Sequence, residues 1–291
     1  MSILYFALIF ILPPNPSVMR LYNLTVWDYK AVVFAASLPL VVAWVAAFVG
    51  YAKLRDYAQM IDTSPEGSSF NTLAKGCGLL AWSLPVLAAV GLVFSSIAGL
   101  WPGLDAATVI SRNYLNLLLP LIAFTIIGAT SRQLVKQIGI QINRSSVRLI
   151  MLLFSIAGIL YCYLTFRHFD LTSLGSTQNP YFLPIWLMVI TLTVPYLYIW
   201  FIGSLAAYEI ILFSRHVQGV LYRQALKLLS AGLALIIASS IALQYLGSLH
   251  SPGHLELGYQ LVLGLIFQIL GGSGFVLLAF GAARLKKIEA V

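Results

Sequence analysis

Long apolar runs separated by short polar segments dominate the pattern of this chain. A helix needs about 20 apolar residues to cross the hydrocarbon core of a membrane, and seven runs are near that length. They are Ala31–Tyr51, Gly76–Leu100, Tyr114–Thr130, Leu149–Phe166, Phe182–Leu205, Leu228–Tyr245 and Leu257–Ala283. The pattern predicts an all-α protein, a polytopic transmembrane helical bundle with seven full spans.

A shorter apolar run, Ser2–Leu12, precedes these spans and ends at Pro13 and Pro14. Its length suits the core of a signal peptide, but no Lys or Arg precedes it and no clear cleavage site follows. Three interpretations stay open: a re-entrant or interfacial half-helix, an uncleaved eighth span, and a poor signal peptide, the first two being favoured. We therefore expect residues 1–30 to form an apolar N-terminal segment with an outer loop, and residues 31–291 to form the bundle.

Composition narrows the class of protein further. Of the 291 residues, 60% are apolar and 9% are charged, whereas a soluble domain carries roughly 25% charged residues. This balance excludes a soluble globular protein, intrinsic disorder and a disulfide-framed secreted domain. The net charge of +8 comes from loops between apolar runs, so no nucleic-acid partner is expected.

The placement of the basic residues predicts the orientation. If the seven spans alternate in direction, 13 of the 17 Lys and Arg residues fall on one side of the membrane. Because cytoplasmic loops carry the excess of positive charge, we expect a cytoplasmic C-terminus in a plasma or cytoplasmic membrane. Basic side chains near the inner leaflet attract anionic lipid, although an ordinary positive-inside bias also explains them. The residues expected at that leaflet are Arg132, Lys136, Arg144, Arg148, Lys286 and Lys287.

Candidate polar contacts inside the spans are few. Glu209 is the only acid within an apolar run, and it lies near the end of that run. The uncharged candidates are Asn116, Gln244, Gln260 and Gln268. Such groups hydrogen-bond neighbouring helices or contact a ligand.

Patterns for catalysis or metal binding are weak. His250 and His254 share a loop without an evident third ligand, and Ser273 has no histidine at matching depth to act as its base. We therefore expect no enzyme activity, catalytic residue, metal or cofactor.

Small residues at helical spacing predict where helices approach one another. One such series is Ser230, Ala234 and Ala238, and another is Gly271, Gly272 and Gly274. We expect both series to face neighbouring helices.

Seven spans with an internal C-terminus resemble the topology of rhodopsins and seven-helix receptors. A retinal protein of that kind has a lysine midway along its last helix, whereas Lys286 and Lys287 lie past the end of the last run. The resemblance is therefore one of topology alone.

The function expected from these patterns is that of a non-enzymatic integral membrane protein that acts by binding protein partners or lipid. The alternative is a transporter or receptor for a small, weakly polar molecule, using Asn116, Gln260 and Gln268. That alternative predicts a water-accessible cavity at mid-membrane.

Overall fold

A computed structural model describes residues 2–14, 19, 23–100, 105–140, 142–167, 185–249 and 257–288. The regular structure of this part of the chain is entirely helical, which confirms the predicted all-α class. The helices are α1 (Ser2–Ile11), α3 (Val26–Met60), α4 (Pro65–Leu100), α5 (Asp105–Gln137), α6 (Arg144–Arg167), α7 (Ile185–His216), α8 (Val220–Leu249) and α9 (Leu257–Ile288).

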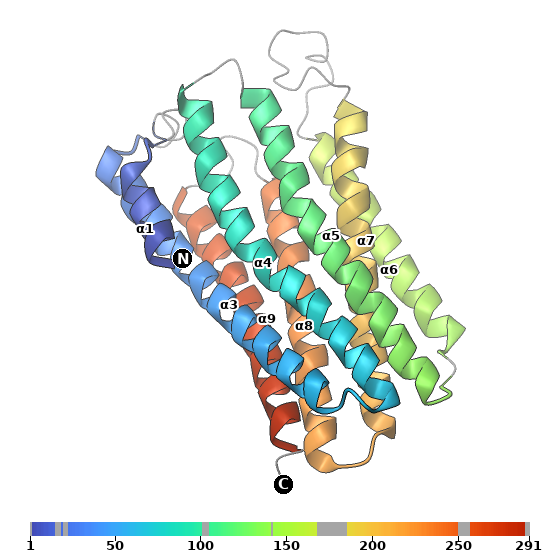
Figure 1. Ribbon diagram of the computed structural model, residues 1–291. Helices are drawn as coiled ribbons and strands as arrows, with labels where there is room; N and C mark the ends of the chain where they lie inside the picture. Colours follow the sequence, from blue (N-terminus) through green and yellow to red (C-terminus); the bar gives the residue numbers. More distant parts are fainter. Residues whose placement is uncertain are drawn as a thin grey trace.

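Six of the described helices, namely α3, α4, α5, α7, α8 and α9, are long and apolar enough to cross a membrane. This is the architecture of a multi-pass membrane protein, and within the described part of the chain the count of such helices is six where the sequence predicted seven spans. The predicted span Leu149–Phe166 lies on α6, which runs beside α7 (Figure 1) and is not among the six.

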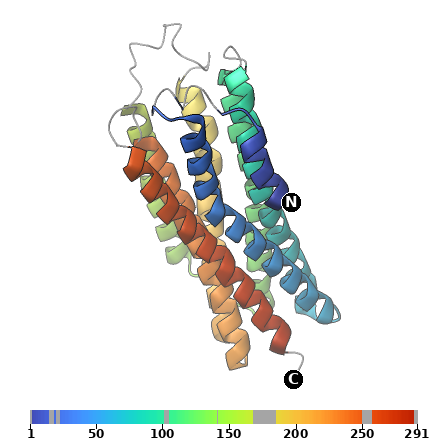
Figure 2. The same ribbon diagram turned by 90° about the vertical axis from the view of Figure 1, so that its left-hand side faces the viewer.

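The same six helices form a closed ring. Each packs mainly on two neighbours, in the order α3, α4, α5, α7, α8, α9 and back to α3. Helix α6 packs on the outside of this ring against α7 and α8, and α1 packs outside it against α3 and α4. Figures 1 and 2 show the helices running together along one direction, with the C-terminal end of α9 near the turns that join α3 to α4 and α7 to α8.

Helix α1 is too short to be an eighth full span. Its 10 residues rise about 15 Å, half of the roughly 30 Å hydrocarbon core. Its Tyr5 and Ile9 are buried against Ala88, and the Tyr5 hydroxyl lies 3.1 Å from Oγ of Ser37 on α3. The described length is that of a half-helix; whether the segment is re-entrant, interfacial or a signal peptide is not distinguished by this length, and each interpretation stays a prediction.

Close backbone approach holds the ring together, because apolar area does not drive helices together in lipid. Gly232 on α8 faces Gly274 on α9, and a Cβ built on Gly232 would lie 2.6 Å from the carbonyl oxygen of Gly274. Gly50 on α3 approaches the backbone of Ala279 on α9 in the same way, at 3.2 Å. Gly274 therefore packs on a neighbouring helix, as the glycine series predicted.

The second small-residue series behaves differently. Ser230 is buried and donates to the carbonyl oxygen of Ala207 at 2.7 Å, whereas Ala234 and Ala238 are exposed. The expectation that the whole series faces a neighbouring helix is wrong, and part of this face of α8 is left open.

Candidate functional site

The turns α3–α4, α5–α6 and α7–α8 lie together with the end of α9 at one end of the bundle, which we call the hairpin end (Figure 1). Two features of the candidate site meet there: a buried carboxylate and a surface of basic side chains.

The buried carboxylate belongs to Glu209 on α7, which is 0% exposed. The Ser131 hydroxyl on α5 donates to its Oε2 at 2.5 Å, and Nε of Arg132 lies 3.3 Å from its Oε1. Each carboxylate oxygen therefore has a partner on the neighbouring helix. The guanidinium supplies the opposite charge, and the side chain of Arg132 remains 49% exposed.

Apolar side chains enclose this contact. Leu134, Val135, Ile210 and Phe213, the neighbours of these residues along α5 and α7, are fully buried. A charge removed from water is costly unless it is paired and hydrogen-bonded. Ser131 and Arg132 supply both requirements, so the contact fixes α5 against α7.

Local signals set the shape of the α5–α6 turn. Gly139 has φ +70°, and the amides of Gly139 and Ile140 donate to the carbonyl oxygens of Lys136 and Val135. This is the glycine-ended helix terminus of the Schellman type. Asn143 then accepts from the amide of Ser145 at 2.9 Å and caps the start of α6.

This geometry gathers four basic side chains around one short turn. We call the set Arg132, Lys136, Arg144 and Arg148 the basic hairpin surface, and all four are exposed. The predicted inner-leaflet residues of this segment therefore lie on the two helix ends that flank this turn. The other two residues predicted at the inner leaflet are Lys286 and Lys287. They fall in the last turn of α9, where the side chains lie outside the described part of the structure.

Two further polar contacts tie the hairpin end together. The Tyr222 hydroxyl at the start of α8 donates to Oε2 of Glu66 on α4 at 3.0 Å. The amide nitrogen of Gln137 donates to Oγ of Ser69 at 3.2 Å. These two hydrogen bonds join α4 to α8 and to α5 at the hairpin end.

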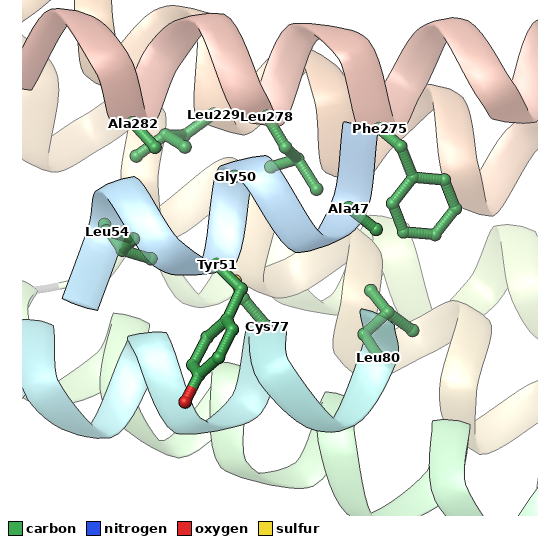
Figure 3. A pocket seen from close by; sticks show the side chains of 10 residues that line it. All are labelled: Ala47, Gly50, Tyr51, Leu54, Cys77, Leu80, Leu229, Phe275, Leu278 and Ala282. Atoms are coloured by element: carbon green, nitrogen blue, oxygen red, sulfur yellow. The ribbon is translucent and has the colours of Figure 1, made fainter. Parts of the chain in front are cut away.

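The centre of the ring is tightly filled. Figure 3 shows the cavity between α3, α4, α8 and α9, lined by side chains such as Leu54, Leu80, Phe275 and Leu278. Its volume is about 10 Å³, which is room for at most about one water molecule. The ring of Tyr51 packs against Gly78 of α4, where an added Cβ would lie 2.9 Å from the ring. This cavity is too small for a ligand, and its lining residues lie toward the hairpin ends of α3, α4, α8 and α9. The mid-membrane cavity expected of a transporter stays a prediction.

The uncharged candidates from the sequence are only partly visible. Gln268 on α9 is partly buried, and its amide oxygen has no hydrogen-bond partner among the described residues. Asn116, Gln244 and Gln260 lie on α5, α8 and α9, but their side chains fall outside the described part. That these four residues hydrogen-bond neighbouring helices or contact a ligand stays a prediction.

Little in the described residues suggests catalysis or metal binding. They contain no group of three or more His, Cys, Asp or Glu side chains that could hold a metal ion. The exposed His216 points back to its own helix, with Nδ1 3.0 Å from the carbonyl oxygen of Leu212. His250 and His254 lie outside the described residues.

Sequence reasoning identified Glu209 but not its partners. Ser131 is 78 positions away along the chain, and a serine at the end of an apolar run carries no pattern of its own. The sequence does offer one signal. Ser131 and Arg132 are adjacent at the end of an apolar run, and they place a hydroxyl and a guanidinium at the membrane depth expected for Glu209.

Comparison of the chain with protein-family models, with curated proteins and with solved structures finds no match.

Proposed function

We propose that this chain is a non-enzymatic membrane protein that binds anionic lipid at its hairpin end, with that end on the cytoplasmic side. The observation that carries the proposal is the basic hairpin surface, four exposed cationic side chains around one short turn. Juxtamembrane clusters of Lys and Arg attract anionic headgroups, each cation contributing about 1 kcal/mol near the surface.

The burial of Glu209 supports this proposal. Glu209, which contacts the basic hairpin surface, is buried and engaged with Ser131 and Arg132. It neutralises part of the charge of Arg132 and leaves Lys136, Arg144 and Arg148 directed outward.

A protein partner with an acidic surface is the other occupant that such cations suit. The apolar flanks of the bundle argue for lipid, because α6 carries large exposed apolar side chains directly beside the cations, among them Leu149, Leu152 and Leu153. A surface that is cationic at its edge and apolar below it matches a phospholipid in both parts.

The test is native mass spectrometry of the delipidated full chain in a neutral detergent, titrated with phosphatidylglycerol or phosphatidylcholine. The unmodified chain should retain phosphatidylglycerol in preference, and Lys136→Gln/Arg148→Gln should reduce that retention. The matched control, Arg55→Gln/Lys75→Gln, removes two exposed cations from α3 and α4 and should have the smaller effect. Equal retention of the two lipids by the unmodified chain would overturn the proposal.

A further inference from the structure

An open groove lies between α7 and α8. It is lined by Ser204, Tyr208 and Ile211 of α7 and by Ala234, Ile237 and Ala238 of α8, among others, and has a volume of about 350 Å³. The hollow exists because the side chains of α8 are small at this point. Since Ala234 and Ala238 are exposed, the groove faces the surroundings of the bundle rather than its core.

Helix α6 leaves this groove open. It contacts α7 and α8 farther from the hairpin end, where the Tyr245 hydroxyl donates to the carbonyl oxygen of Ala157 and Leu197 packs on Gly158. Most of the side chains that line the groove are apolar. Of its hydroxyl groups, that of Ser230 is engaged with the carbonyl oxygen of Ala207 at 2.7 Å, and Ser204 and Tyr208 contribute the others.

Basic residues continue both walls of the groove toward the hairpin end. An α-helix turns about 100° per residue, so Arg215 on α7 follows Ser204 and Ile211 along one face. Lys227 and Arg223 follow Ser230 and Ala234 on α8 in the same way. All three basic residues are exposed, and they bring positive charge to one end of an apolar groove.

The dimensions match one leaflet of a bilayer. From Ser230 to Ile241, which both line the groove, the helix rises about 16 Å. One leaflet contributes about half of the roughly 30 Å hydrocarbon core. A phospholipid with an acyl chain in the groove would therefore have its phosphate about one helical turn beyond the groove, toward the hairpin end. This is the level of Arg215 and Lys227.

From this charge complementarity we infer that the α7–α8 groove binds one anionic phospholipid, with an acyl chain between the two helices and the phosphate at Arg215, Lys227 and Arg223. The inference rests on the proposed affinity for anionic lipid and adds a defined site to it, separate from the basic hairpin surface.

Two kinds of variant test this site in the full chain. Arg215→Gln/Lys227→Gln removes the phosphate contacts, and Ala238→Phe fills the groove without changing any charge. The controls are Arg55→Gln/Lys75→Gln for charge and Ala283→Phe for bulk, because Ala283 lines a comparable apolar groove between α3 and α9. The probe is phosphatidylglycerol, and the readout is the apparent affinity for the first bound lipid by native mass spectrometry.

We expect the affinity for the first phosphatidylglycerol to fall about tenfold or more in both groove variants, and to change little in both controls. Thermal unfolding in detergent shows whether each variant keeps its fold, and because Ala238 and Arg215 are exposed, little loss of stability is expected.

The outcomes separate the two proposals. If the unmodified chain does not prefer phosphatidylglycerol to phosphatidylcholine, both proposals fail. If it does, but the groove variants bind like their controls, the groove site alone is overturned. Loss of a co-purifying protein in Ala238→Phe with unchanged lipid affinity would also overturn it, because the groove would then hold a partner helix.

Discussion

The Ser131 hydroxyl on α5 donates to the Glu209 carboxylate on α7 across 2.5 Å, in a part of the bundle where both side chains are fully buried. This contact joins α5 to α7 next to Arg132 of the basic hairpin surface. It holds the half-exposed Arg132 in place through the second carboxylate oxygen.

A double-mutant cycle measures this contact. We expect Ser131→Ala and Glu209→Ala each to lower the free energy of unfolding, because each removes one partner of the contact. We expect a coupling energy between about 0.6 and 1.7 kcal/mol, the average and the largest value for hydrogen bonds between membrane helices. The measurement is unfolding in mixed detergent micelles with increasing sodium dodecyl sulfate. Additive effects of the two substitutions would show that the contact does not stabilise the bundle.

The close approach of α8 and α9 gives a second prediction. Gly232→Ala places a Cβ 2.6 Å from the carbonyl oxygen of Gly274, so the helices must separate, and we expect a loss of about 1–3 kcal/mol in unfolding free energy. Gly264→Ala on α9 is the control, because its added Cβ meets no atom within 4 Å. Similar stabilities of the two variants would contradict this account of the packing.

Cys77 reports on the alternative of a transporter. It lines the cavity of about 10 Å³ between α3, α4, α8 and α9, which has room for at most about one water molecule. In a Cys162→Ser background we expect Cys77 to resist a charged, water-soluble thiol reagent, while Ser68→Cys, at an exposed position of α4, reacts quickly. Rapid labelling of Cys77 would favour a water-filled pathway.

The cap of α6 provides a test that changes no charge. Asn143→Ala removes the acceptor of the Ser145 amide, and loss of such a cap costs about 0.5–2 kcal/mol. Because α6 carries Arg144 and Arg148, we expect the variant to retain less phosphatidylglycerol in the native mass spectrum. Asn71→Ala, at an exposed position within α4, should retain as much as the unmodified chain.

The apolar runs predicted the helical class and most of the helices, because a membrane-spanning helix requires about 20 consecutive apolar residues. They did not predict how far the helices extend beyond the core. The predicted runs end at Thr130 and resume at Leu149, yet α5 continues to Gln137 and α6 begins at Arg144. Helix ends of this kind depend on local caps such as Gly139 rather than on hydropathy.

The site was predictable only in part, since its contacts join distant segments. The cations of the basic hairpin surface were identified because charge in a loop is visible in the sequence. The partner of Glu209 was not, and neither was the groove, because the series Ser230, Ala234 and Ala238 suggests helix packing until the position of α6 is known. Small residues show where a close approach is allowed, but not whether a helix or a lipid takes the space.

The central claim is that the hairpin end binds anionic lipid. The most direct measurement is the lipid content of the protein after extraction from its own membrane with a lipid-preserving polymer, compared with the bulk membrane by mass spectrometry. The account predicts enrichment of anionic headgroups around the protein, reduced in Lys136→Gln/Arg148→Gln. A lipid composition equal to that of the bulk membrane would contradict it.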